Sequence, residues 1–412
     1  MFHRFVRAAF ILSCAYVPFA SAQQRDDITF LRSAAEAGDA RAQFTLANRY
    51  YRGLGVRQNY DQAVALYRQS ADQAFAPAQV RLGILHEQGL GVQQSYGRAM
   101  TLYRMAAVQG DAQAQYKLGM LYETGKGGRE DYAQALQWFR KAAEQGHADA
   151  EEEVGYFYQR GFLGPRDYDQ AQAWYKRAAE HGCTNAQNQL GYMAQLALGM
   201  PQDFVQALDW YYKAASQGNP NAQENIGYMY QHGLGVEVDY VEAQNWYYKA
   251  AGQGNSNAEN QLGYMYQYGL GVPQDFAQAL AWYRMAADEG NKTAKENLES
   301  VSTILKSGED DVWEMANAAA QKAAEAQAAR RVRIAKLQRE ISELESDAQR
   351  EESLATELDR PESGSISGVN ALGSLGVLQL RKEAQNFRAE AARLRGELAG
   401  LDVLSAGRAS AQ

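Results

Sequence analysis

The chain has 412 residues, of which 46% are hydrophobic and 22% are charged. These proportions are ordinary for a globular protein and exclude a wholly disordered chain. The formal net charge is −8, which argues against nucleic-acid binding, because that function needs a basic surface. The 37 Gly and 26 Tyr beside only 7 Pro and 2 Cys indicate that one small motif is copied many times.

Residues 1–22 have the character of a secretory signal peptide. The apolar stretch from Ala8 to Ala20 is shorter than the roughly 20 residues that span a bilayer. Ala20-Ser21-Ala22 supplies the small residues of a cleavage site. We expect cleavage and export to the periplasm. The alternatives are an N-terminal membrane anchor and lipidation at Cys14.

After that cleavage Cys183 is the one remaining cysteine, so no disulfide can form within the mature chain. Cys183 follows a glycine turn at a position where other copies of the motif carry Asp, Phe, His or Asn. We interpret it as a loop residue. The alternative is a thiol contact between molecules.

An alanine recurs at intervals of 36 residues through most of the chain. The anchors are Ala42, Ala78, Ala114, Ala150, Ala186, Ala222, Ala258 and Ala294. They define seven full units without insertion or deletion. A period of this length is typical of helical solenoids.

The sixth unit shows how each part contributes to a helix pair. Ala222, Ile226, Gly227 and Tyr230 share one helical face, which predicts a first amphipathic helix. A glycine inside a helix costs about 1 kcal/mol, so Gly227 indicates close approach by the backbone of a neighbouring helix. The glycine-rich turn 233–236 ends this helix.

A second helix follows in each unit and begins after a residue suited to capping. These cap residues are Asn59, Ser95, Asp131, Asp167, Asp203, Asp239 and Asp275. In the sixth unit the second helix is expected to bury Ala243, Trp246, Tyr247 and the pair 250–251. Five tryptophans share one offset: Trp138, Trp174, Trp210, Trp246 and Trp282. We predict that their indoles pack in the core against small Ala and Gly residues.

The repeated pattern A-x-x-x-L-G-x-x-Y-x-x-G-x-G-V-x-x-D-Y-x-x-A-x-x-W-Y-x-K-A-A-x-Q-G resembles the Sel1-like repeat family, a relative of the tetratricopeptide repeats. The resemblance covers about 250 of the 412 residues. Departures at His86, Leu163, Ala194 and Ala197 put local helix ends in question. The resemblance implies an exported bacterial protein with an all-α, right-handed α-solenoid of seven helix-pair repeats. It also implies an adaptor role without catalysis.

The segments around the array follow from changes in composition and period. We expect a signal peptide at 1–22, an N-terminal capping helix at 23–41, the repeats at 42–293 and a C-terminal capping helix at 294–308. A long heptad helix at 309–359, a Gly/Ser-rich linker at 360–376, a second heptad helix at 377–402 and a disordered tail at 403–412 follow. The two heptad helices form a coiled-coil-like tail.

Each heptad helix carries an apolar seam that needs a partner. The first seam runs through Ile334, Leu337, Ile341, Leu344, Ala348, Ala355 and Leu358, and the second through Val377, Leu380, Ala384, Phe387, Ala391, Leu394, Leu398 and Leu401. Closing a short linker costs only a few kcal/mol, which favours an antiparallel hairpin within one chain. Self-association of two chains through these helices is the alternative.

A stripe on the first helices is left over once the core positions are assigned. By analogy with tetratricopeptide repeats it should line a concave groove and bind a partner. The candidate residues are Tyr156, Gln159, Tyr192, Gln195, Tyr228, Gln231, Tyr264 and Gln267. Tyr offers a flat apolar ring and Gln both a donor and an acceptor, which suits an extended peptide or a glycan strand. The alternative is recent duplication of units four to seven with no binding role.

Sequence signatures of catalysis and cofactor binding do not emerge. The GLGV turns lack the phosphate-loop pattern, the histidines are scattered, and neither a nucleophile elbow nor a Cys/His dyad is recognisable. We therefore predict no enzyme activity, no cofactor and no metal.

The predicted function is a protein–protein interaction scaffold in the bacterial envelope, whose partner is an envelope protein or peptide. The alternative is a peptidoglycan- or glycan-binding module. A second alternative is a hydrolase of the cysteine-rich Sel1-like type, which the single cysteine of the array disfavours. No nucleic-acid partner is expected, and no membrane span after signal cleavage.

Overall fold

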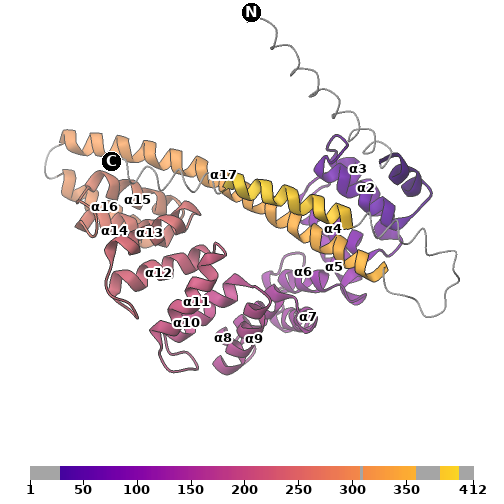
Figure 1. The fold of residues 1–412 in the computed structure, drawn as a ribbon, viewed down its shortest axis with the longest axis horizontal. Helices are drawn as coiled ribbons and strands as arrows, with labels where there is room; N and C mark the ends of the chain where they lie inside the picture. The colour runs from indigo at the N-terminus through magenta and orange to yellow at the C-terminus, as the bar shows by residue number, and fades with distance from the viewer. Residues whose placement is uncertain (1–27, 307–309, 359–380, 399–412) are drawn as a thin grey trace, which may run out of the picture. The chain divides into compact units, whose positions relative to one another are not determined.

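The computed structural model describes residues 28–306, 310–358 and 381–398, and every regular element in these ranges is a helix (Figure 1). After a helix over residues 28–36, the first three repeats form α2 (Ala40–Arg52), α3 (Tyr60–Asp72), α4 (Ala76–Gln88), α5 (Tyr96–Val108), α6 (Ala112–Thr124) and α7 (Tyr132–Glu144). The last four form α8 (Ala148–Arg160), α9 (Tyr168–Glu180), α10 (Thr184–Gln195), α11 (Phe204–Ser216), α12 (Pro220–His232), α13 (Tyr240–Gly252), α14 (Ser256–Tyr268) and α15 (Phe276–Asp288). Then come α16 (Lys292–Lys306), α17 (Asp310–Leu358) and a helix over residues 381–398. Tandem helix pairs confirm the expected α-solenoid.

The chain divides into two compact units within the fifth repeat. The first unit runs to Met193 and includes Leu198–Met200, and the second contains Ala194–Ala197 and the chain from Pro201 onward. Here α10 ends one position earlier than the first helices of the other repeats. Ala197 has a φ of 57° where the other repeats place the glycine that ends the first helix. The sequence departure at Ala197 therefore does alter a helix end.

Polar side chains cap both helices of a repeat. All seven predicted caps of the second helices are confirmed; for example, Asp131 Oδ1 accepts a hydrogen bond from the Gln134 amide at 2.9 Å. A second set, which sequence reasoning did not identify, caps first helices, as where Asp111 Oδ1 accepts from the Ala114 amide at 2.8 Å. Its other members include Asp39, Asn219, Asn255 and Asn291. These bonds satisfy backbone amides that have no partner within the helix.

In five repeats a glycine inside the first helix faces an aromatic ring from the second helix of the same repeat. A Cβ atom on Gly227 would lie 2.7 Å from the ring of Tyr247, and one on Gly155 would lie 2.8 Å from the ring of Tyr175. The expectation of a neighbouring backbone is therefore corrected. It is chiefly a ring that needs this space, although the Ala243 carbonyl oxygen also lies 3.1 Å from the Cβ position at Gly227.

The core aromatic is the residue after each tryptophan, so the prediction that the indoles fill the core is wrong. Phe139, Tyr175, Tyr211, Tyr247 and Tyr283 are all 0% exposed. The five tryptophans are only partly buried. Successive helix residues point about 100° apart, which turns the indole toward the edge of the core. There Lys249 Nζ lies 3.7 Å from the ring centroid of Trp246, and Trp138, Trp174 and Trp210 have similar cations.

The first helices bury a residue that the sequence prediction did not include. In α12 Met229 is buried and Tyr230 is only partly buried. The Tyr230 hydroxyl lies 2.8 Å from the hydroxyl of Tyr212 on α11, and Tyr158 accepts from Arg140 on α7 at 2.6 Å. These tyrosines therefore join their first helices to the second helix of the preceding repeat.

The helix over residues 381–398 packs antiparallel on α17 within one chain. Ion pairs join Arg333 to Glu397, Glu345 to Arg395 and Glu352 to Arg388, so the start of one helix meets the end of the other. The buried seam comprises Leu337, Ile341, Leu344, Ala348, Ala355, Ala384, Phe387, Ala391 and Leu394. This is the hairpin that the two heptad seams favoured, and α17 also packs against α15 (Figure 1).

Several predicted segments fall outside the described residues. They are the signal peptide at 1–22, the linker at 360–376 and the tail at 403–412. Among the residues that the structure describes, no helix is both long and apolar enough to cross a membrane.

Candidate functional site

The four predicted groove tyrosines occupy one position on α8, α10, α12 and α14. Tyr192 is 40% exposed and Tyr264 is 38% exposed, whereas Tyr156 and Tyr228 are partly buried. Large aromatic side chains normally gain most by complete burial. Tyrosine rings that stay partly or largely exposed on successive first helices are therefore available for contact with another molecule.

Each of three tyrosines lies against the residue one turn further along its helix. The ring of Tyr228 lies 4.1 Å from that of His232, and the ring of Tyr264 lies 4.6 Å from that of Tyr268. In α8 the Arg160 guanidinium lies 5.9 Å from the Tyr156 ring. We call these positions the tyrosine face of each unit. It comprises Tyr156, Arg160 and Tyr192 in the first unit, and Leu196, Tyr228, His232, Tyr264 and Tyr268 in the second.

The predicted glutamines link this face to the core. Gln231 Oε1 accepts a hydrogen bond of 2.7 Å from the hydroxyl of the buried Tyr247. The same bond joins Tyr175 to Gln159, Tyr211 to Gln195 and Tyr283 to Gln267, at 2.6–2.7 Å. The acceptor oxygen of each glutamine is thus used inside the fold, and only the amide nitrogen stands outside this bond. Each glutamine therefore holds the hydroxyl of a core tyrosine, a role that sequence reasoning missed.

The third repeat breaks this pattern and creates a group of carboxylates. It has Phe139 in place of the core tyrosine and Glu123 in place of the glutamine, so the core hydroxyl that donates at this position in other repeats is missing. Burial, with a contribution from Glu130, raises the pKa of Glu123.

Two carboxylates of the fourth repeat are affected in the same way. Burial and then Asp149 and Glu123 raise the pKa of Glu152 to about 7. Burial, then Glu152, Glu123 and Asp149 raise the pKa of Glu153 to about 8. Part of this acidic group is therefore protonated at neutral pH.

A buried glutamine follows the anchor alanine and connects adjoining helices. Gln79 Nε2 donates to the Ala71 carbonyl at 3.2 Å, and Gln79 Oε1 accepts from Gln109 at 2.9 Å. Gln43 and Gln115 make both equivalent bonds. The recurrence of Gln directly after the anchor alanine was the sequence signal that could have revealed this network.

The fourth repeat replaces this glutamine by a charged cluster. Glu151 is 0% exposed; Arg177 Nη2 lies 3.0 Å from one of its oxygens and His181 Nδ1 lies 2.7 Å from the other. Arg177 also donates to the Ala143 carbonyl at 3.2 Å. In other repeats the glutamine makes this donation, which a carboxylate cannot make. The substitution is therefore compensated by its neighbours.

Cys183 stands at the residue before α10 and is 7% exposed. Burial raises the pKa of its thiol to about 12, so the thiol is protonated at neutral pH and is a poor nucleophile. The structure therefore disfavours the thiol contact between molecules that the sequence left open.

The turn of the fourth repeat is displaced from the position that it has in other repeats. Elsewhere a turn glycine lies against the preceding second helix; for example, a Cβ atom on Gly235 would lie 2.9 Å from Phe204. Leu163 at this position has a side chain and is exposed. Phe162 instead stacks on Tyr132 with ring centroids 4.8 Å apart.

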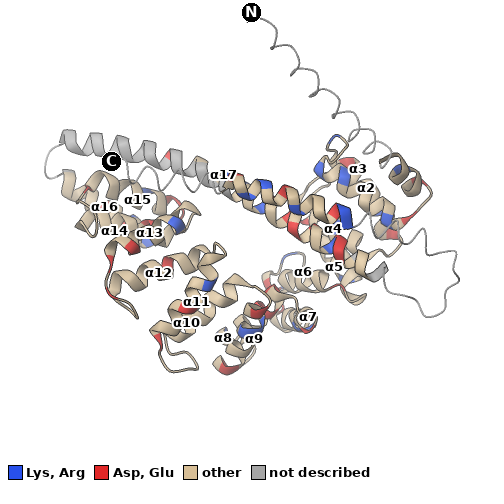
Figure 2. Cartoon of the chain, viewed as in Figure 1, with Lys and Arg blue, Asp and Glu red and all other residues tan. Residues whose placement is uncertain are grey.

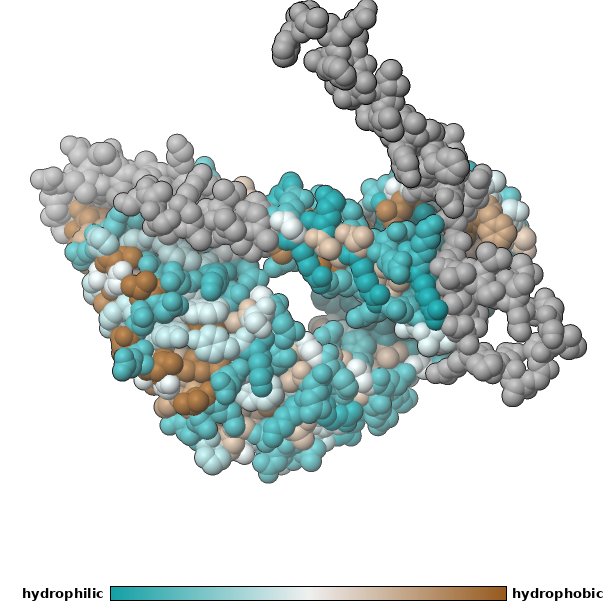
Figure 3. Space-filling model, viewed as in Figure 1, coloured by the Kyte–Doolittle hydropathy of each residue, from teal (hydrophilic) through white to brown (hydrophobic). Residues whose placement is uncertain are grey.

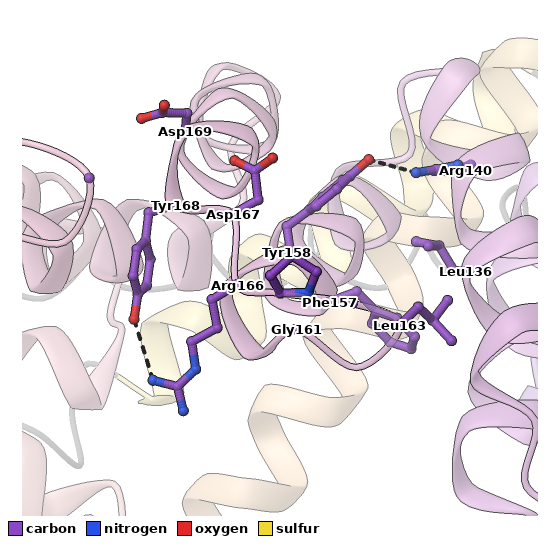
Figure 4. A pocket seen from close by; sticks show the side chains of 13 residues that line it. Leu136, Arg140, Phe157, Tyr158, Gly161, Leu163, Arg166, Asp167, Tyr168 and Asp169 are labelled. Atoms are coloured by element: carbon purple, nitrogen blue, oxygen red, sulfur yellow. Dashed lines mark hydrogen bonds between the residues drawn. The ribbon is translucent and has the colours of Figure 1, made fainter.

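A hollow of about 590 Å³ lies beside this turn (Figure 4). Its lining includes Leu136, Phe157, Leu163, Arg140 and Arg166. Figure 4 shows Arg140 pointing to the Tyr158 hydroxyl and Arg166 to the Tyr168 hydroxyl, at 2.6 and 3.5 Å. The tyrosines therefore hold both arginines at the edge of a partly apolar hollow.

Charge is distributed unevenly over the helices of the second unit. The first helices α12 and α14 contain no Lys or Arg, and α12 is largely tan in Figure 2. Burial raises the pKa of Glu224 on α12 to about 7. Figure 3 shows hydrophobic side chains scattered among hydrophilic ones on this face of the molecule. Among the described residues, no group of three His, Cys, Asp or Glu could hold a metal ion.

The Sel1 repeat matches the chain seven times, at residues 40–75, 76–111, 112–147, 148–183, 184–219, 220–255 and 256–291. The chain belongs to the Sel1 repeat family. Proteins built from Sel1 repeats are generally protein-interaction scaffolds.

Two solved structures support this assignment. One is c5321, a protective antigen of uropathogenic Escherichia coli with an SLR fold. It is 31% identical over 87% of this chain and 71% of its own, with a TM-score of 0.58. The other is a Sel1 repeat protein from Oxalobacter formigenes, 33% identical over 59% of this chain and 96% of its own, with a TM-score of 0.55. A search of the curated proteins returned no relative.

Proposed function

We propose that this Sel1 repeat protein is a non-catalytic scaffold of the bacterial cell envelope that binds a segment of a partner protein on its tyrosine face. The observation that carries the proposal is the recurrence of an accessible tyrosine at one position of four successive first helices. In each of these repeats the neighbouring glutamine is fixed by a core tyrosine. A surface held in place in this way loses little conformational entropy when a partner binds.

The envelope location rests on the signal-peptide character of residues 1–22. After export, the folded repeats would meet a partner in the periplasm. Expression with and without residues 1–22, followed by cell fractionation, tests this part of the proposal. Recovery of both forms in the cytoplasm would contradict it.

A glycan is the second candidate ligand, because the face combines tyrosine rings with amide side chains and α12 and α14 carry no Lys or Arg. Aromatic rings and amides can contact the apolar faces and hydroxyls of sugars. Muramidase treatment of the envelope extract separates the two candidates. Partner capture that survives this treatment supports a protein ligand, and capture that is lost supports peptidoglycan.

The direct test is a pull-down from envelope extract with the double variant Tyr192→Ala and Tyr228→Ala. Removing two rings should reduce partner recovery at least tenfold. The matched control is Val205→Ala with Val241→Ala, which changes two exposed residues of the second helices. Unchanged recovery by a tyrosine variant that retains its helicity would contradict the proposal.

A further inference from the structure

We infer that the part of the tyrosine face on α12 and α14 binds a basic, proline-rich segment in the polyproline II conformation. This inference rests on the proposed function and names the chemistry of the partner. Its surface consists of the tilted ring pair Tyr228 and His232, the tilted ring pair Tyr264 and Tyr268, and Glu224.

The spacing of the two aromatic pairs is the first argument. Cα atoms of α12 and α14 approach within 8 Å of one another only where the two first helices come closest, and helices in contact have axes about 8–10 Å apart at such a point. A polyproline II helix has three residues per turn and a rise of about 3.1 Å per residue, which gives a repeat of about 9 Å. Every third residue of such a segment would therefore meet the next aromatic pair.

The shape and accessibility of the aromatic pairs are the second argument. Tyr264 and Tyr268 are both exposed, and their rings lie 4.6 Å apart with planes tilted by 49°. Tyr228 and His232 form the equivalent pair at 4.1 Å and 30°. Two adjacent aromatic ridges of this kind give the aromatic-lined surface that proline-rich segments use in known recognition domains.

Hydrogen bonding is the third argument. A polyproline II segment exposes its carbonyl oxygens and, at each proline, lacks an N–H group. The surface should therefore supply donors. Gln267 accepts from Tyr283 through Oε1 at 2.7 Å, so the group outside this bond is the donor Nε2. The tyrosine hydroxyls of the face are further donors.

Charge complementarity selects the basic form of the segment. Because α12 and α14 contain no Lys or Arg, nothing on these helices repels a cationic side chain. Glu224 supplies a carboxylate, and the tyrosine rings attract cations through their faces. Burial raises the pKa of Glu224 to about 7, and a bound guanidinium would favour its ionised form. An acidic segment would gain neither contact.

The test uses the full chain and three labelled synthetic peptides in fluorescence anisotropy. The first is (Arg-Pro-Pro)4, the second is (Arg-Ala-Ala)4 with the same charge and no proline, and the third is (Glu-Pro-Pro)4 with the opposite charge. We expect the first peptide to bind at least tenfold more tightly than either of the others. Equal binding of the first two peptides, or of the first and third, would overturn the inference.

Variants locate the binding on the protein. Tyr228→Ala with Tyr264→Ala should weaken binding of (Arg-Pro-Pro)4 at least tenfold, whereas the same pair changed to Phe should stay within about threefold because the rings remain. Tyr240→Ala is the matched control, since Tyr240 is 37% exposed on α13. If the alanine pair impairs folding, Glu224→Gln should still weaken binding about threefold. Unchanged affinity in both variants would overturn the inference.

Failure of the inference can be distinguished from failure of the proposed function. Loss of peptide selectivity together with tyrosine-dependent recovery of a partner from envelope extract would reject only the polyproline chemistry. Loss of both would reject the binding role of the tyrosine face itself.

Discussion

The smallest structural unit of this fold is a glycine packed under an aromatic ring. In the sixth repeat the ring of Tyr247 occupies the space where a side chain on Gly227 would lie. The hydroxyl of the same tyrosine holds Gln231, which adjoins the tyrosine face. A single residue thus connects the packing of two helices to the surface that we propose for binding.

Gly227→Ala should destabilise the protein, because the added Cβ would lie 2.7 Å from the ring and overpacking typically costs about 1–3 kcal/mol. Gly252→Ala is the matched control. Its Cβ would meet no atom within 4 Å, and replacing a helical glycine gains up to about 1 kcal/mol. Urea unfolding of both variants checks the prediction, and equal stability of the two would contradict it.

The carboxylates of the fourth repeat should make stability depend on pH. Raised pKa values mean that the folded state holds protons which the unfolded state has released above about pH 4.3. The stability that Glu152 and Glu153 contribute to the folded state is therefore present below that pH and is lost as pH rises through about 7 and 8.

Glu152→Gln with Glu153→Gln should accordingly stabilise the protein more at pH 8 than at pH 5. The difference should be about 1 kcal/mol or more, because one pKa unit corresponds to about 1.4 kcal/mol. Urea midpoints of the variant and the wild type at both pH values give the measurement. Parallel stability profiles would show that these groups titrate normally in the folded state.

At the scale of the element, the fourth repeat shows how one helix pair tolerates a buried charge. Arg177→Ala should cost about 3 kcal/mol, because it removes the guanidinium that lies 3.0 Å from the buried Glu151 carboxylate. Adding Glu151→Gln should recover more than half of this loss. The amide could then donate to the Ala143 carbonyl, as Gln79 donates to Ala71. Thermal unfolding of the double-mutant cycle tests this, and simple additivity would contradict it.

Two turns contain an alanine where the other repeats use glycine. Ala74 and Ala197 have φ values of 62° and 57°, and this left-handed conformation costs an alanine about 1–2 kcal/mol. Ala74→Gly and Ala197→Gly should each stabilise the protein by about 0.5–1 kcal/mol after the entropy of glycine is considered. Gly218→Ala, with φ of 89° and open surroundings, should destabilise it by a similar amount. Calorimetry checks the prediction. If the two glycine variants and Gly218→Ala do not change the stability in opposite directions, this explanation is wrong.

The sequence was sufficient to predict the elements, the caps of the second helices and the hairpin of the two heptad helices. Those features depend on local periodicity and on single polar side chains at helix ends, as at Asp131. The choice between Trp246 and Tyr247 for the core could not be predicted in the same way. Both are large aromatics at adjacent positions, and only the packing against Gly227 decides which ring is enclosed.

The candidate site was predictable in its residue types but not in its bonding. The repeated tyrosines and glutamines were visible, whereas the use of Gln231 Oε1 by a core hydroxyl required the helix pair in three dimensions. The compensation of Glu151 by Arg177 likewise joins positions 26 residues apart. A period in the sequence reports which positions are equivalent, but it does not report which of them touch.

At the scale of the whole molecule, the repeats divide their residues between two tasks. Second helices contribute the buried tyrosines and the cations that cover the tryptophans. First helices of the later repeats contribute the accessible tyrosine rings. In this division the second helices maintain the array, and the first helices of the later repeats are those that we propose bind the partner.

Site-specific photo-crosslinking in the native host tests that claim most directly. A photoreactive phenylalanine would replace Tyr192 or Tyr264 on the first helices, and Val205 or Val241 on the second helices, all of which are exposed. We expect one partner to be crosslinked from both first-helix positions and to be absent from both second-helix positions. Crosslinks of equal yield from the second-helix positions, or from those positions alone, would contradict it.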